Sequence, residues 1–237
     1  MLTIGLLGGM SWESTAEYYR LINRGVRDRL GGDHSARIVI LSVDFGTISP
    51  LLLGGEWTRL EAELVSEALR LKAAGADFLL IATNSMHMFA AAIEAATGLE
   101  VLHIADPAGA AVAAAGHRQV GLIATRSTME QPFYADRLRD RFGIAVITPN
   151  DEDRATIHRV IFEELVRGVI RAESREAYRA VMARLADRGA QAVVLACTEI
   201  MLLVQPQDST LPLFDTTALH AAAAVERALA QNGRKAP

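Results

Sequence analysis

The chain has 237 residues, of which 51% are hydrophobic and 22% are charged, and its formal net charge is −4. This length and composition predict a folded protein with a sizeable core and room for two small domains, and the absence of a basic cluster argues against a nucleic-acid partner. Cys197 is the only cysteine, which excludes an internal disulfide and makes a reducing cytoplasm the expected compartment.

Short, continuous apolar runs bounded by turn residues predict β-strands along the whole chain. Apolar and polar residues do not alternate in these runs, so both faces of each strand are expected to be buried, as in parallel sheets. None of the runs is long enough to span a membrane, and we expect no membrane partner. The predicted strands are Leu2 to Leu7, Arg37 to Val43, Asp77 to Ala82, Val101 to Ile104, Gln119 to Ala124, Ile144 to Thr148, Ala192 to Ala196 and Leu211 to Phe214.

Helical patterns separate these strands. Ser14 and Glu17 have the spacing of a capping box, which predicts a helix that starts there and runs through Arg27. Further helices are predicted over Thr58 to Ala74, Asp153 to Val169 and Ser174 to Arg188. Alternating strands and helices predict an α/β fold with open, mostly parallel sheets flanked by helices, in which ligands bind at the carboxyl ends of the strands.

Two halves of the chain resemble each other. The same offset of 114 residues separates Gly75 from Gly189 and Thr83 from Cys197, and an upstream match has an offset of 116. We interpret these ordered matches as an old duplication, with chance similarity among Ala- and Leu-rich segments as the alternative. The duplication predicts a first α/β domain of residues 1–104 plus a C-terminal helix over 217–237, and a second α/β domain of residues 105–216.

Each matched segment ends in a polar turn, Thr83 to Ser85 in the first half and Cys197 to Glu199 in the second. A lone cysteine after a buried strand is commonly a small core residue. The polar residues after Cys197, however, predict a helix N-terminus, whose free N–H groups and dipole favour a thiolate. Two such turns facing each other would bind a small anion and stabilise negative charge beside it.

Four motifs resemble those of the aspartate/glutamate racemase family, in its branch with threonine in place of the first catalytic cysteine. They are IGLLGGMSWEST at Ile4 to Thr15, TNSMH at Thr83 to His87, ACTEI at Ala196 to Ile200 and FDT at Phe214 to Thr216. The resemblance implies two pseudosymmetric α/β domains with the active site in the interdomain cleft. It also implies a cofactor-independent amino-acid racemase or epimerase that forms a homodimer.

The resemblance implies a role for individual residues. Thr83 and Cys197 would be the catalytic pair, one removing the α-proton of an amino acid and the other returning a proton on the opposite face. A threonine hydroxyl is far less acidic than a thiol, whose pKa is about 8.5 in a model peptide, so proton removal is expected to be easier from the Cys197 face. The substrate's carboxylate and amine would be held by Met10, Asn84, Ser85, Thr198 and Glu199.

The resemblance also implies that the pocket for the substrate side chain differs from that of the acidic amino-acid racemases. Two positions that are polar in those enzymes correspond here to Leu52, in the segment Ser49 to Gly54, and to Val166. This loss of polar partners for a distal carboxylate favours neutral over acidic amino acids. Arg167 and Arg126 are the candidates for a replacement cation.

Lysine content argues against pyridoxal phosphate, which needs a lysine for its Schiff base. Lys72 and Lys235 are the only lysines, and neither lies in a segment suited to that cofactor. No cofactor is expected, and the spacing of His103 and His220 does not suggest a metal. His87 has two interpretations, a group that polarises the site from the next helical turn or a structural histidine.

Two other functions stay open beside racemisation. One is an enantioselective decarboxylase of the same fold, because such relatives keep only the second-half thiol. The other is a non-catalytic protein that binds amino acids in a cleft retained after loss of the first cysteine.

Overall fold

The computed structural model describes residues 1–230, which form two compact units. Unit 1 comprises Met1–His103 and the C-terminal stretch that begins at His220, and unit 2 comprises Ile104–Leu219. The expected boundaries at 104/105 and 216/217 lie close to these. The helix expected over 217–237 is observed as α11, Thr216–Leu229, and residues 231–237 of that prediction lie outside the described part.

Unit 1 contains a three-stranded parallel sheet with the strand order β2-β1-β3. Its strands are β1, Ile4–Gly8; β2, Ile38–Ser42; and β3, Phe78–Ile81. Val101 continues the sheet through a single parallel bridge to Leu79. The strand predicted over Val101 to Ile104 is therefore reduced to one bridging residue, because the chain turns there into helix α5.

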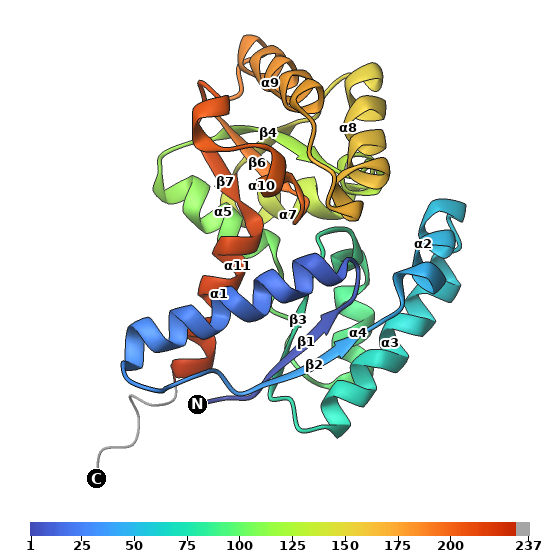
Figure 1. Cartoon of the computed structure of the whole chain (residues 1–237), viewed down its shortest axis with the longest axis vertical. Helices are drawn as coiled ribbons and strands as arrows, with labels where there is room; N and C mark the ends of the chain where they lie inside the picture. The colour runs from blue at the N-terminus through green and yellow to red at the C-terminus, as the bar shows by residue number, and fades with distance from the viewer. Residues whose placement is uncertain (231–237) are drawn as a thin grey trace. The chain divides into compact units, whose positions relative to one another are not determined.

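Helices cover this sheet. α1, Trp12–Leu30, and α11 pack on the face formed by Ile4, Leu6 and Phe78, and Figure 1 shows α1 lying across the strands. α3, Trp57–Ala73, also contacts β1. The remaining elements of the unit are α2, Phe45–Gly54; the 3₁₀ helix η1, Ser85–Phe89; and α4, Ala90–Thr97.

Unit 2 contains a four-stranded parallel sheet with the order β5-β4-β6-β7. Its core joins residues of β4 and β6 to α7, α8 and α9 (Figure 1). The strands are β4, Gln119–Ala124; β5, Ala145–Ile147; β6, Ala192–Ala196; and β7, Leu213–Asp215. The helices are α5, Ala105–Ala114; α6, Arg126–Glu130; α7, Pro132–Phe142; α8, Asp151–Glu163; η2, Leu165–Arg167; α9, Ala172–Asp187; α10, Ile200–Leu203; and η3, Pro206–Asp208.

The two units repeat one connection pattern. Each places its first strand between the second and the third, and each adds a fourth position beside the third strand. Leu79 pairs with Val101 at that position in unit 1, and Val193 pairs with Leu213 in unit 2. Leu79 and Val193 are 114 residues apart, which is the offset found in the sequence. The shared topology is what a duplication predicts.

Two predicted helix boundaries are wrong. α1 begins at Trp12 with Ser11 as its N-cap, and Glu17 pairs with Arg20 on the exposed face instead of capping the helix. The Ser14/Glu17 spacing misled because residues three apart share a face in any helical turn. The helix predicted over Asp153 to Val169 ends at Glu163, because Glu164 leaves the helical conformation. Within residues 1–230, no helix is both long and apolar enough to cross a bilayer.

Candidate active site

The glycine-rich loop after β1 is fixed by close packing. Gly9 has φ +90°, and a Cβ there would clash with the backbone of Val43 at the end of β2. Thr15 Oγ1 accepts a hydrogen bond from the Gly9 N–H at 2.8 Å and donates one to the Ser11 carbonyl at 2.9 Å. Met10, predicted to contact substrate, lies in this loop and is 5% exposed. The motif therefore specifies one conformation of the loop at the carboxyl end of β1.

The turn after β3 carries Thr83, Asn84 and Ser85. Thr83 is half-buried, and Asn84 and Ser85 are buried. His87 lies on η1, and its Nδ1 donates a hydrogen bond to the Thr83 carbonyl oxygen at 2.8 Å. A carbonyl only accepts, so Nδ1 carries the proton and Nε2 has the free lone pair. His87 thus contacts the backbone of the predicted catalytic threonine.

Behind this turn lies a buried cluster of rings from three segments of unit 1. The ring centroids of His103 and His220 lie 4.7 and 5.6 Å from that of His87. His220 Nε2 donates to the Leu102 carbonyl at 2.6 Å, and its Nδ1 accepts from the Tyr18 hydroxyl at 2.8 Å. Burial, and next to it the neighbouring His103, hold the pKa of His87 well below the usual histidine value. His87 is therefore neutral at physiological pH.

The turn after β6 carries Cys197, Thr198 and Glu199, which are 7%, 8% and 3% exposed. One carboxylate oxygen, Glu199 Oε2, accepts from Cys197 Sγ at 3.1 Å and from Thr198 Oγ1 at 2.8 Å. The sequence assigned Glu199 to the substrate and missed this contact with the thiol. The available signal was the presence of a carboxylate two residues after a cysteine in a short turn.

The thiol is protonated in this environment. Burial raises the pKa of Cys197 well above its usual value, and the Glu199 carboxylate raises it further. The backbone N–H groups of Thr198 and Glu199 act in the opposite direction and do not outweigh these effects. The expected preference for the thiolate at these N–H groups is therefore outweighed by burial and by the Glu199 carboxylate.

The residues predicted to shape the substrate pocket lie on different elements. The segment Ser49 to Gly54 forms the second half of α2. Leu52 lies on this helix and is 8% exposed. Val166 lies on η2 and packs against the core of unit 2. Arg126 is the first residue of α6 and Arg167 is the last residue of η2. Both are exposed, and Arg126 Nε lies 4.0 Å from Glu130 Oε1.

Lys72 is exposed on α3, and Lys235 lies outside the described residues. Within residues 1–230, no group of three or more His, Cys, Asp or Glu side chains is arranged to hold a metal ion.

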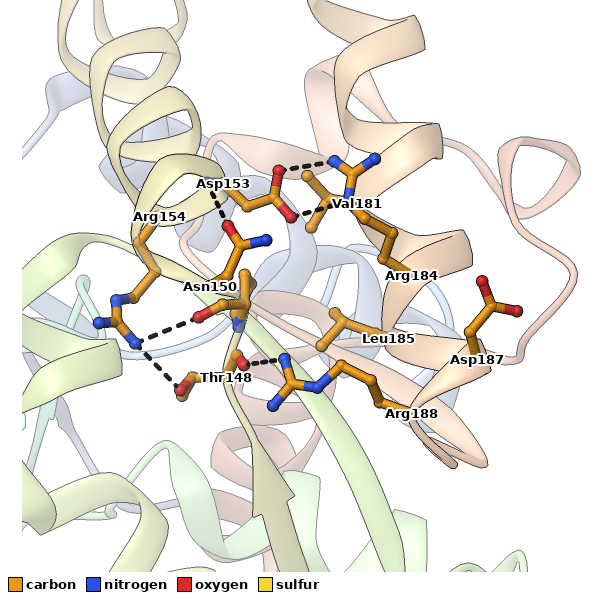
Figure 2. A pocket seen from close by; sticks show the side chains of 10 residues that line it. Thr148, Asn150, Asp153, Arg154, Val181, Arg184, Leu185, Asp187 and Arg188 are labelled. Carbon is orange, nitrogen blue, oxygen red and sulfur yellow. Dashed lines mark hydrogen bonds and ion pairs between the residues drawn. The ribbon is translucent and has the colours of Figure 1, made fainter.

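A cavity of about 470 Å³ in unit 2 is lined by residues of the segment 148–154 and by residues near the end of α9 (Figure 2). Arg184 makes two contacts with Asp153 at 2.6 and 2.8 Å, and Arg188 donates to the Thr148 carbonyl at 2.7 Å. Arg154 is engaged by the Pro149 carbonyl at 3.1 Å. The guanidinium groups in this cavity already have protein partners, and no residue of the two polar turns lines it. We therefore do not assign the substrate to it.

Comparison with known proteins resolves the family. The Asp/Glu/hydantoin racemase family pattern matches residues 7–224. The chain belongs to this family. A Yersinia pestis structure grouped with the Asp/Glu racemases is 50% identical, covers 97% of this chain and all of its own, and has a TM-score of 0.89. An aspartate racemase homologue from Pyrococcus horikoshii is 28% identical, with 96% and 99% coverage and a TM-score of 0.81.

Family membership indicates an amino-acid racemase, and the fold of two parallel-sheet α/β domains flanked by helices agrees with the sequence prediction. The fold alone does not define the reaction. Unliganded arylmalonate decarboxylase is 15% identical, with 96% of this chain and 93% of that chain covered and a TM-score of 0.50. At that identity the likeness concerns only the fold.

Proposed function

We propose that this family member is a cofactor-independent racemase that interconverts L- and D-amino acids by transferring the Cα proton between Cys197 and Thr83. The observation that carries the proposal is the placement of a thiol and a hydroxyl in equivalent turns of two duplicated units, each after the third strand of its sheet. Parallel α/β sheets bind ligands at this edge.

The reaction follows from the two groups. One group takes the α-proton and leaves a carbanion, and the other supplies a proton to the opposite face, so the configuration at Cα inverts. In this proposal the thiol serves one face of the substrate's Cα and the hydroxyl serves the other. Backbone and side-chain donors of Met10, Asn84, Ser85 and Thr198 would hold its carboxylate and amine.

We further propose neutral or broadly chosen amino acids as substrates. Support comes from the apolar side chains of Leu52 and Val166 at the positions expected to meet the substrate side chain. An apolar wall offers no partner for a distal carboxylate, so burying one against it is unfavourable. We also propose that the protein is a homodimer and acts in the cytoplasm.

Solvent deuterium exchange tests the function directly. Single enantiomers of a panel of amino acids are incubated in deuterated water with the wild type and with Cys197→Ser and Cys197→Ala. We expect Cα deuteration and loss of circular dichroism with the wild type, and at least a 100-fold lower rate with Cys197→Ala. Lack of exchange for every amino acid in the panel would contradict racemisation.

A decarboxylase is the second candidate, because the chain has one thiol and the matching turn has a threonine. It predicts carbon dioxide release from an arylmalonate, with loss of that activity in Cys197→Ala. Exchange at amino-acid Cα atoms without carbon dioxide release from a malonate would exclude it. An amino-acid binding protein without activity predicts neither result.

A further inference from the structure

The thiol of Cys197 needs a proton acceptor before it can act as a base. Only the thiolate removes a proton, and burial keeps this thiol protonated. The Glu199 carboxylate lies within hydrogen-bond distance, with Oε2 3.1 Å from Sγ. Both side chains are almost fully buried, at 7% and 3% exposure, so the contact is shielded from bulk water.

We propose that Glu199 accepts the Cys197 proton through this 3.1 Å hydrogen bond and thereby makes the thiol a base; the proposal rests on the racemase function given above. The S–H bond breaks, its electron pair stays on sulfur, and an O–H bond forms at Oε2. The thiolate then takes the substrate α-proton, and the Cα–H electron pair stays on carbon. When Cys197 acts as the acid, these two transfers run in reverse.

Charge conservation within the pair favours this route. The pair holds one negative charge before and after the internal transfer, so the transfer does not add a second buried charge, whereas loss of the proton to solvent does. Thr198 holds the carboxylate in place through its 2.8 Å hydrogen bond to the same oxygen. The backbone N–H groups of Thr198 and Glu199 stabilise the thiolate once it forms. Glu199 therefore acts through Cys197 and does not need to touch the substrate.

Because Cys197 is the only cysteine, alkylation by iodoacetamide reports on a single thiol. If the pair shares one proton, the fraction of molecules with that proton on Glu199 does not depend on pH as long as the pair keeps one proton and one negative charge. We expect the wild-type alkylation rate to level off over roughly two pH units around neutrality and to rise only in alkali. A wild-type rate that falls about tenfold per pH unit down to pH 5.5, as for an isolated thiol, overturns the proposal.

Glu199→Gln is the decisive variant, because it keeps the size of the side chain and cannot accept the proton. We expect the plateau to disappear and the alkylation midpoint to move to lower pH, since the carboxylate charge that raises the thiol pKa is gone. Cα exchange from the Cys197 face should fall about 100-fold in kcat with little change in KM. Faster alkylation with unchanged or faster exchange would show a purely electrostatic role and overturn the proposal, as would a plateau that survives the substitution.

Glu164→Gln is the matched control. Glu164 is also a buried glutamate of unit 2, at 5% exposure, and it accepts a hydrogen bond from Ser174 at 2.6 Å. This variant should keep the plateau. If Glu199→Gln does not fold, as judged by circular dichroism, Glu199→Asp replaces it and should lower the plateau by drawing the carboxylate away from Sγ.

The two proposals fail separately. A plateau in the alkylation rate without Cα exchange of any amino acid would contradict the racemase function but support proton sharing between Cys197 and Glu199. Exchange without a plateau would keep the racemase function and remove the role of Glu199.

Discussion

At the scale of single residues, the two halves of the proposed site are chemically unequal. Cys197 is buried beside a carboxylate, whereas Thr83 is half-buried and its carbonyl is bound by a neutral histidine. A thiol titrates near about 8.5 in a model peptide and an alcohol far higher, so the alkoxide needed to remove a proton is far less populated at neutral pH than a thiolate. We infer that proton removal at the Thr83 face limits turnover in one direction.

Thr83→Cys tests this inference. The substitution replaces the hydroxyl by a more acidic group of similar size, so we expect the rate of Cα exchange from the Thr83 face to rise by at least tenfold. Initial rates with each enantiomer in deuterated water measure the two faces separately. Thr83→Ser is the control that keeps a hydroxyl and should keep the asymmetry, and Thr83→Val should abolish turnover. A lower rate with cysteine than with threonine would argue against Thr83 as an acid or base.

At the scale of elements, loops at the carboxyl ends of strands carry the predicted site residues, and each loop is held by local hydrogen bonds. The loop after β1 depends on Thr15 and on Gly8 and Gly9. The turn after β3 depends on His87, and the turn after β6 depends on Glu199. Loops fixed in this way hold their donors in place before a ligand binds.

Gly9→Ala tests the packing of the first loop. The residue has φ +90° and faces the Val43 backbone, so a Cβ adds both backbone strain and a clash. We expect the free energy of unfolding in urea to fall by about 2 kcal/mol or more.

Gly31→Ala is the matched control, because Gly31 has φ +73° but nothing within 4 Å of an added Cβ. It should cost about 1 kcal/mol through backbone strain alone. Equal losses for both variants would show that the clash with β2 contributes nothing.

At the scale of the whole molecule, the two units share one strand order, but they bury different ionisable side chains. Unit 1 encloses the rings of His87, His103 and His220 with Tyr18, and unit 2 encloses the Cys197–Glu199 pair. Buried histidine that stays neutral makes folding depend on pH.

We predict that the unfolding free energy falls in mild acid. The pKa of His87 is lowered in the folded state and near about 6.5 when unfolded, so below that pH the unfolded chain binds a proton that the folded chain does not. Stability is therefore complete above pH 6.5 and is lost as pH falls. The contribution of His87 should reach about 1 kcal/mol between pH 7 and 5.5.

His87→Asn isolates this contribution, since it removes the titrating ring and retains a donor near the Thr83 carbonyl. Urea unfolding at several pH values should show a weaker pH dependence for this variant, while His34→Asn, at an exposed position, should leave the wild-type dependence unchanged. An unchanged slope in His87→Asn would assign the pH dependence to other groups. The neighbouring groups are His103 and His220, which face the His87 ring, and Tyr18, which is hydrogen-bonded to His220. His158 in unit 2 also has a lowered pKa, through burial and the nearby Arg126, and titrates separately.

Sequence patterns predicted much of the fold because they record burial. The runs around Phe78–Ile81 and Ala192–Ala196 are apolar on both faces, and both are fully buried parallel strands. The offset between Thr83 and Cys197 predicted the repeated strand order. Local boundaries were less certain, since Ser14 and Glu17 match a capping box although Ser11 is the N-cap.

The sequence by itself determined the family, the alternating α/β architecture and the two turns that carry the thiol and the hydroxyl, because these depend on residue type and spacing. Only the tertiary structure decided which groups touch them. The Cys197 thiol lies against Glu199, and burial raises the pKa of that thiol. His87 is hydrogen-bonded to the Thr83 carbonyl. The neighbouring His220 binds Tyr18, which is 202 residues away in the sequence. The contacts of Cys197 and of His87 join residues close in sequence, but they depend on side-chain direction, which residue type and spacing do not fix. The packing of His220 against Tyr18 joins distant segments, which no local pattern contains.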